Sequence, residues 1–208
     1  TTLTVDTGLP AAPTLIRLGG DTTAPYRTSD TTPTLVGSGE ASSVITVRTT
    51  TGVFIASGTV DLSGSYALTL SPSLAEGSYT VDITSTDLAD NESLPTTVSF
   101  TVDTTAPTAP TVEPLPNPSA TGAVTLSGTT SPNADIEVTN ASGTVLCTTT
   151  ATSTGYYSCG PLTPAPLDGT HSLTITACDT ATLPNCSNTP TTLTVDTGLP
   201  AAPTLIRL

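Results

Sequence analysis

Carboxylates are the side chains of this sequence that are best suited to bind an ion. The chain of 208 residues has 17 acidic and 4 basic residues, for a formal net charge of −13. Ca²⁺ binds about 6–8 oxygen ligands, and no dense D-x-D-x-D loop supplies them within one segment. A Ca²⁺ site therefore requires acids from several loops to converge. The alternative is that these acids are solvated residues of polar loops.

Four cysteines, the other residues with chemical potential, all lie in the second half of the chain: Cys147, Cys159, Cys178 and Cys186. This clustering favours two local disulfides formed outside the cytoplasm. A zinc site is the rival interpretation. It is disfavoured because the spacing contains no C-x₂-C pair.

Catalysis finds little support in the residue types. The sequence contains no Lys, which excludes Schiff-base chemistry and Lys–Asn isopeptide cross-links. His171 is the only histidine, and a Ser–His–Asp arrangement carries no information in a chain so rich in Ser, Thr and Asp. We therefore expect a structural or surface histidine, and no enzyme.

Charge and hydropathy exclude two kinds of partner. Phosphate affinity comes from clusters of Lys and Arg, and none exists here, so nucleic acids and anionic membranes are disfavoured. No stretch of 18 apolar residues occurs, so we expect no direct membrane insertion.

Internal repeats organise the chain. Residues 1–18 and 191–208 are identical, which indicates one 190-residue period of a tandem array plus the start of the next copy. A segment excised from a longer protein is expected, since Thr1 is not a natural start. A weaker repeat at an offset of 91 divides the period in two, because Leu35-Val36-Gly37 matches Leu126-Ser127-Gly128 and Tyr66 matches Tyr157.

The repeats predict four parts. These are a last strand and linker copied from a preceding repeat (1–9), a first domain (10–103), a second, disulfide-containing domain (104–196) and the start of the next repeat (197–208). The motif Thr-Val-Asp-Thr occurs three times, at 4–7, 101–104 and 194–197.

Short alternating segments predict β-strands in both domains. Ile45 and Val47 alternate with Val44, Thr46 and Arg48, the two-residue period of a half-buried strand. Helices are disfavoured because Thr, Gly and Pro are poor helix formers. For the first domain we expect strands at 13–18, 32–38, 43–50, 53–60, 65–70, 78–86 and 96–103. About 90 residues with seven strands indicate an immunoglobulin-like sandwich. The expected fold is all-β, with two tandem seven-strand sandwiches in an elongated arrangement.

The strand pattern is accompanied by a more specific resemblance. The segments 32–40, 77–81, 86–93 and 101–107 resemble the bacterial Ig-like repeats of giant surface adhesins, such as the extender regions of RTX-type biofilm and ice-binding adhesins. The first unit matches closely, whereas the second departs from the pattern, with Ser131 in place of Glu40. The resemblance implies tandem arrays that hold a binding tip away from the cell, many of them rigidified by Ca²⁺ at domain junctions.

The sandwich fold predicts where the acids meet. Loops 39–42 and 87–95 should lie at the pole where the chain arrives, and loop 19–31 at the opposite pole. The Ca²⁺ ligands expected at the first pole are Asp6, Glu40, Asp87, Asp90 and Asn91. Those expected at the second pole are Asp21, Asp30 and Asp103, with Asn133, Asp135 and Asp179 across the junction, while Asp196 ends the second unit in the same way.

Alignment of the two units also suggests how the cysteines pair. Cys147 and Cys159 fall on adjacent strands with a hairpin between them, so a Cys147–Cys159 disulfide is reasonable. Cys178 and Cys186 bracket the loop before the last strand, and a bond between them would cinch it. The Glu76-Gly77 and Asp168-Gly169 pairs precede a strand, where turn chemistry is expected.

Three functions are compatible with these features. The leading hypothesis is a spacer on the bacterial cell surface, in contact with neighbouring repeats of the same chain. The second is a glycan- or protein-binding module using a loop such as 113–118, although a connection between strands is the preferred interpretation of that segment. The third is an extracellular filament with other copies of the chain, in which residues 1–8 add to an exposed strand edge.

Overall fold

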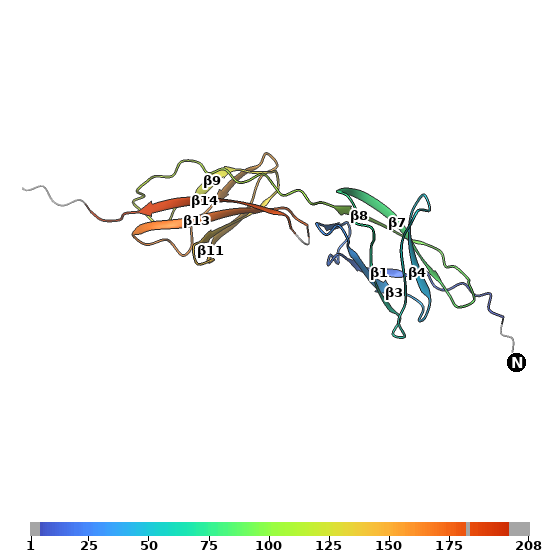
Figure 1. Cartoon of the computed structure of the whole chain (residues 1–208). Helices are drawn as coiled ribbons and strands as arrows, with labels where there is room; N and C mark the ends of the chain where they lie inside the picture. Colours follow the sequence, from blue (N-terminus) through green and yellow to red (C-terminus); the bar gives the residue numbers. More distant parts are fainter. Residues whose placement is uncertain (1–4, 182–183, 200–208) are drawn as a thin grey trace, which may run out of the picture. The chain divides into compact units, whose positions relative to one another are not determined.

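The computed structural model describes residues 5–181 and 184–199. The regular secondary structure in these ranges consists of β-strands alone. The chain divides into two compact units with a boundary between Thr105 and Ala106 (Figure 1). Each unit is a sandwich of two sheets, which confirms the predicted all-β class with two tandem domains. Within the described ranges, no helix is long and apolar enough to span a membrane.

Unit 1 contains a three-stranded and a five-stranded sheet. The smaller sheet has the order β1-β3-β6, with β1 at Thr14–Leu18, β3 at Thr34–Ser38 and β6 at Ser65–Thr69. The larger sheet has the order β2-β8-β7-β4-β5, with β2 at Tyr26–Thr28, β8 at Thr96–Val102, β7 at Gly77–Thr86, β4 at Val44–Thr49 and β5 at Phe54–Thr59. Each of the seven predicted ranges overlaps a strand whose ends lie within two residues of the prediction.

One strand of unit 1 was not predicted. The three-residue strand β2 pairs in parallel with β8, with Tyr26 opposite Phe100 and Thr28 opposite Val102. A segment this short has no measurable periodicity, so the hydrophobic pattern does not reveal it.

Unit 2 repeats the architecture with a smaller first sheet. Its two-stranded sheet pairs β12 (Tyr156–Cys159) with β9 (Leu126–Thr129). Its larger sheet has the order β11-β10-β13-β14, with β11 at Val145–Thr150, β10 at Asp135–Asn140, β13 at Gly169–Cys178 and β14 at Cys186–Val195. The predicted hairpin between the strands of Cys147 and Cys159 is wrong, because β11 pairs with β10 and β12 pairs with β9.

The proline-rich segment 113–118 connects the two sheets of unit 2. At its start, the Glu113 amide donates a hydrogen bond to the Ser127 carbonyl oxygen on β9 (2.8 Å). Just after it, the Ser119 amide donates to the Thr194 carbonyl oxygen on β14 (2.8 Å). The segment therefore crosses from the smaller to the larger sheet, whereas the preferred interpretation of the sequence is a connection between two strands.

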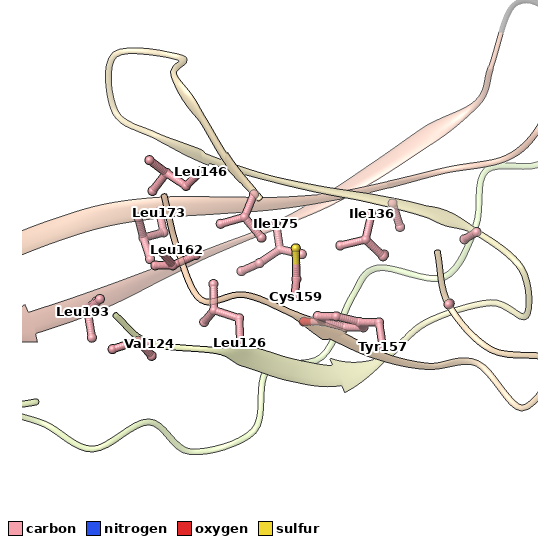
Figure 2. Close-up of a cluster of buried hydrophobic side chains, with 14 of the residues drawn as sticks. Val124, Leu126, Ile136, Leu146, Tyr157, Cys159, Leu162, Leu173, Ile175 and Leu193 are labelled. Atoms are coloured by element: carbon pink, nitrogen blue, oxygen red, sulfur yellow. The ribbon is translucent and has the colours of Figure 1, made fainter. Parts of the chain in front are cut away.

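Each unit has its own hydrophobic core. In unit 1, Ile45 and Val47 are fully buried, as their alternation predicts. In unit 2, Figure 2 shows Leu126 and Tyr157 of the smaller sheet packing toward Ile136 of the larger one. Burying one such side chain contributes about 1.5–3 kcal/mol, so the alternating residues account for the docking of the sheets.

A tyrosine and a glycine explain the strongest matches between the units. The Tyr66 hydroxyl donates a hydrogen bond to the Thr14 carbonyl oxygen (2.9 Å), and a Cβ atom at Gly37 would collide with both groups. In unit 2, the Tyr157 hydroxyl donates to the Thr111 carbonyl oxygen in the same way (2.6 Å). The glycine therefore leaves room for a tyrosine that ties the first segment of each unit to its sheet.

Candidate functional site

An acidic cleft of about 280 Å³ lies at the pole of unit 1 where the chain arrives. It is lined by Asp6, Glu40, Ala41, Ser43, Asp87, Leu88 and Ala89. Asn91 reaches the same place, since its side-chain amide donates a hydrogen bond to the Asp6 carbonyl oxygen (3.3 Å). The structure thus brings together Asp6, Glu40, Asp87 and Asn91 from three separate segments. Asp90, the fifth residue predicted here, belongs to the same loop but does not line the cleft.

Asp87 organises the loop in which it lies. One carboxylate oxygen accepts hydrogen bonds from the amides of Ala89 (2.8 Å) and Asn91 (2.9 Å). The other accepts one from the Asn91 side chain (2.9 Å). These hydrogen bonds, those from Asn91 above all, lower the pKa of Asp87. Its charge is therefore used to close the loop, and it contributes to the negative potential of the cleft.

Asp6 and Glu40 are the residues of the cleft with spare oxygen atoms. One Asp6 carboxylate oxygen accepts a hydrogen bond from the Gly8 amide (2.9 Å). In the described part of the chain, no hydrogen bond or ion pair involves the Glu40 carboxylate. Both side chains are exposed. Oxygen-only donors of this kind suit Ca²⁺, which takes carboxylate, carbonyl and water oxygens.

The cleft alone does not provide a complete set of protein ligands. Within residues 5–181 and 184–199, no group of three or more His, Cys, Asp or Glu residues is arranged to hold a metal ion. An ion bound by Asp6 and Glu40 would thus have to complete its coordination with water or backbone oxygens. The donor atoms are of the type that Ca²⁺ binds, but the cleft does not supply a full set of them.

At the opposite pole of unit 1, an arginine already supplies the positive charge. The Arg27 guanidinium pairs with the Asp103 carboxylate (2.6 Å), and the Arg27 amide donates to the Asp21 carboxylate (3.1 Å). Asp21 and Asp103 therefore come together as predicted, but around Arg27. Asp30 closes a local turn by accepting a hydrogen bond from the Thr32 amide (2.8 Å).

The predicted ligands of unit 2 also have structural roles. Asp179 repeats the arrangement of Asp87, because its carboxylate accepts hydrogen bonds from the amide (3.2 Å) and the side chain (2.7 Å) of Asn185. Asp196 accepts a hydrogen bond from the Gly198 amide (2.9 Å). Asp135 accepts one from the Thr150 hydroxyl (3.0 Å). Asn133 has a positive φ of 59°, a conformation that Asn tolerates better than most residues.

Two acids that the sequence places in turns, Glu76 and Asp168, also bind residues beyond the last strand of their unit. The Glu76 carboxylate accepts hydrogen bonds from the hydroxyls of Thr105 (2.6 Å) and Thr104 (2.9 Å), just after the last strand of unit 1. The Asp168 carboxylate accepts two from Thr197, from its hydroxyl (2.7 Å) and its amide (3.0 Å). The matching Glu-Gly and Asp-Gly pairs mark these two positions in the sequence, but the sequence does not show which residues the acids contact.

The structure contains both of the predicted disulfides. Cys147–Cys159 joins β11 of one sheet to β12 of the other, with Cα atoms 5.9 Å apart, so it spans the sandwich. Cys178–Cys186 joins residues that face each other on β13 and β14, with Cα atoms 4.2 Å apart. The second bond closes the loop that the Asp179–Asn185 contacts also hold.

His171 has a structural equivalent in unit 1. Its Nε2 atom lies 2.7 Å from the Leu167 carbonyl oxygen, four residues earlier. In unit 1, the Tyr79 hydroxyl donates to the Ala75 carbonyl oxygen in the same way (2.8 Å). The contact tethers a turn, which is the structural role expected for this histidine.

Comparison with known proteins shows which family has this architecture. The family model described as the bacterial Ig domain matches residues 10–102 and again residues 106–196. No curated protein matches the chain.

Solved structures with a similar fold include two that are named for biofilm or adhesion proteins. The BSP domain of a biofilm-associated protein is 21% identical, with a TM-score of 0.35, over 92% of this chain and 30% of that chain. A tetra-tandem repeat in the extending region of a large adhesion protein is 26% identical, with a TM-score of 0.37, over 89% of this chain and 49% of that one. The chain thus spans less than half of the length of either.

A third solved structure supports the fold alone. The fibronectin(III)-like modules of Clostridium thermocellum CbhA are 15% identical, with a TM-score of 0.51, over 88% of this chain and 92% of that chain. The chain thus shares its fold with these fibronectin(III)-like modules.

Proposed function

Since the chain belongs to the bacterial Ig domain family, with two copies in tandem, we propose that it is a spacer segment of a bacterial cell-surface adhesin. The observation that carries this proposal is the tandem organisation itself. Two family units follow one another directly, and the 18 residues that begin the period return after it. Such an array would hold a binding domain away from the cell surface.

The surface of the sheets supports a spacer role. Hydroxyl side chains face each other across strands, such as Thr80 with Ser99 (3.0 Å) and Thr170 with Thr194 (3.2 Å). These faces can remain in water without a partner. The net charge of −13 adds mutual repulsion between neighbouring copies, and we propose that no catalysis takes place on this chain.

An extracellular location follows from the same proposal. Disulfides persist in oxidising surroundings, and unit 2 contains two of them. The partners that we propose are the neighbouring repeats of the same chain.

Ca²⁺ at the acidic cleft is the finer part of the proposal. Asp6 precedes unit 1 in the chain, whereas Glu40 and Asp87 belong to it. A bound Ca²⁺ would neutralise these carboxylates and tie the arriving segment to the unit. We restrict this proposal to the acidic cleft, because Arg27 supplies positive charge at the opposite pole of unit 1.

The spacer proposal is tested by length. Arrays with one, two and four copies of the 190-residue period, fixed at one end and tagged at the other, are measured by single-molecule imaging in Ca²⁺. A stiff spacer lengthens in proportion to the number of periods, whereas a flexible string lengthens roughly with the square root of its length. Square-root growth would contradict the proposal.

The binding-module and filament hypotheses remain as alternatives. Segment 113–118, the loop considered for binding, joins the two sheets of unit 2 through the contacts of Glu113 and Ser119. Strand exchange relies on residues 1–8, of which 1–4 lie outside the described residues. Glycan arrays probe the first alternative, and the molecular mass in solution with and without residues 1–8 probes the second.

A further inference from the structure

The last three residues of the repeated Thr-Val-Asp-Thr motif each have an identifiable task in unit 1, where the motif occupies 101–104. Val102 is fully buried in the core. The Asp103 amide donates a hydrogen bond to the Thr28 carbonyl oxygen on β2 (2.9 Å). The Asp103 carboxylate accepts one from the Thr105 amide (3.2 Å), which turns the chain as it leaves β8. The motif thus ends the last strand and starts the linker.

Unit 2 performs the same tasks with its own copy, at 194–197. Val195 is buried in the core. The Asp196 amide donates to the Ser119 carbonyl oxygen (2.9 Å), the counterpart of the bond to Thr28 in unit 1. The Asp196 carboxylate accepts a hydrogen bond from the Gly198 amide (2.9 Å). The agreement extends from the strand into the segment beyond it.

The last threonine of the motif completes the arrangement by contacting the turn before β7 in unit 1 and the turn before β13 in unit 2. In unit 1 the acceptor is Glu76, which binds the hydroxyls of two successive threonines, Thr104 and Thr105. In unit 2 the acceptor is Asp168, one carbon shorter, which binds the hydroxyl and the amide of Thr197 alone. The same clamp is therefore made twice with different acids and different donors.

The clamp acts where the chain has little remaining freedom. Beyond Thr105, the linker continues with Ala106 and Pro107. The ring of a proline fixes its own φ, and the residue before a proline is restricted to extended conformations. Once Thr104 and Thr105 are held, no unrestricted residue separates β8 from Pro107.

We propose that Glu76 and Asp168 are positioning residues that clamp the start of the linker to the end of its own unit and so fix the direction in which the chain leaves it. This inference rests on the proposed spacer function, to which it adds a specific device. Hydrogen bonds to a carboxylate are stronger than those between neutral groups. A neutral replacement should therefore weaken the clamp even where it keeps an oxygen acceptor.

The test measures linker motion in the whole 208-residue chain by ¹⁵N relaxation. In the natural protein, the amides of Thr104 and Thr105 should have order parameters near those of the strands, about 0.85. Glu76→Ala should lower them toward about 0.6 or below, the range of flexible segments. Glu76→Gln should give an intermediate value, and Thr105→Val should loosen the same residues from the other side of the contact.

Glu92→Ala is the matched control, because Glu92 is an exposed acid of unit 1 whose side chain makes no hydrogen bond to a linker residue in the described part of the chain. It should leave the order parameters of Thr104 and Thr105 unchanged. The thermal midpoint of unit 1 is followed in parallel, and Asp168→Ala is read out at Thr197. Unchanged order at Thr104 and Thr105 in a folded Glu76→Ala variant overturns the inference. That result would leave the length test of the spacer proposal untouched, since the two measurements are independent.

Discussion

The Tyr66 hydroxyl donates a hydrogen bond to the backbone carbonyl oxygen of Thr14, 2.9 Å away. The two groups meet where a Cβ atom of residue 37 would lie if that residue were not glycine. Burial raises the pKa of Tyr66 to about 12, so the hydroxyl remains a donor throughout the physiological pH range. The contact fixes β1 on the smaller sheet of unit 1 from a residue 52 positions later in the chain. Tyr157 holds Thr111 in unit 2 by the same means.

Replacement of this tyrosine should cost stability in its own unit. Tyr66→Phe removes one hydrogen bond and should destabilise unit 1 by about 1 kcal/mol. Urea unfolding followed by NMR signals of the unit 1 core measures the change. Tyr156→Phe, followed by signals of the unit 2 core, is the control, since Tyr156 is exposed and its hydroxyl makes no hydrogen bond in the described part of the chain. Equal losses of unfolding free energy in the two variants, each measured in its own unit, would refute the role given to Tyr66.

Gly37→Ala should destabilise unit 1 more than Tyr66→Phe does. The added Cβ would collide with the Thr14 carbonyl oxygen and with the Tyr66 ring, so a backbone segment has to move. Overpacking of this kind costs about 1–3 kcal/mol. The same unfolding experiment measures it, and the amide exchange of β1 should accelerate together with the loss of stability. A neutral effect would mean that the close approach at Gly37 is not required.

Reduction of the disulfides should destabilise unit 2 and leave unit 1 unchanged. Each bond closes a short loop, with sequence separations of 12 and 8, and contributes about 2–3 kcal/mol in the chain-entropy model. Unit 1 contains no cysteine and serves as the internal control. Thermal unfolding with and without reductant, followed by signals from each unit, measures the effect. Parallel shifts of both units would contradict it.

The two disulfides should differ in their contribution. Cys159 is 1% exposed in the core, and its bond joins the small two-stranded sheet to the larger one. The double variant Cys147→Ala/Cys159→Ala should therefore cost more than Cys178→Ala/Cys186→Ala, which opens only the end of β13 and β14. Separate unfolding midpoints of the two double variants decide the order.

The strands were predictable because buried and exposed side chains alternate along them. Ile45 and Val47 point inward and Thr46 outward, so residue type alone marks the strand. The partner of a strand was not predictable, because a two-residue period says which face is buried and not which strand lies alongside. For this reason β11 was expected beside β12, whereas it pairs with β10.

The positions of the acids were predictable, but their contacts were not. Loop membership indicated that Asp6, Glu40 and Asp87 gather at one pole, and they line one cleft. The pairing of Asp103 with Arg27 depends on the parallel strand β2, which is too short to be found in the sequence.

Acid should weaken the linker clamps. Hydrogen bonds from threonines lower the pKa of Glu76 and of Asp168, from ordinary values of 4.5 and 3.8. A carboxyl group whose pKa is lower in the folded state stabilises that state above the ordinary pKa, and the contribution is lost as the pH falls through the folded value. Stability should therefore fall between about pH 5 and pH 2. Asp61 and Asp87, whose pKa values are also lowered, contribute in the same direction.

Neutral variants isolate the clamp from these other acids. Glu76→Gln should reduce the slope of unit 1 stability against pH in this range, and Asp168→Asn should do the same for unit 2. Urea titrations at a series of pH values measure both slopes. The nearby Asp103 raises the pKa of Glu76 slightly, so its influence opposes that of the threonines. An unchanged slope in both variants would show that the clamps carry no linked proton.

Ca²⁺ should raise the thermal midpoint of unit 1 and leave that of unit 2 nearly unchanged. A ligand present at 100 times its dissociation constant stabilises the folded state by about 2.7 kcal/mol. The Asp6→Asn/Glu40→Gln variant should lose the effect, because it removes the carboxylates with spare oxygens while leaving the Asp87 loop intact. Glu92→Gln, which neutralises one acid that does not line the cleft, should retain it. Midpoints are compared in Ca²⁺, Mg²⁺ and EDTA. Equal midpoints in Ca²⁺ and EDTA would leave these acids as solvated and structural residues, and a shift retained by the double variant would move the ion to another site.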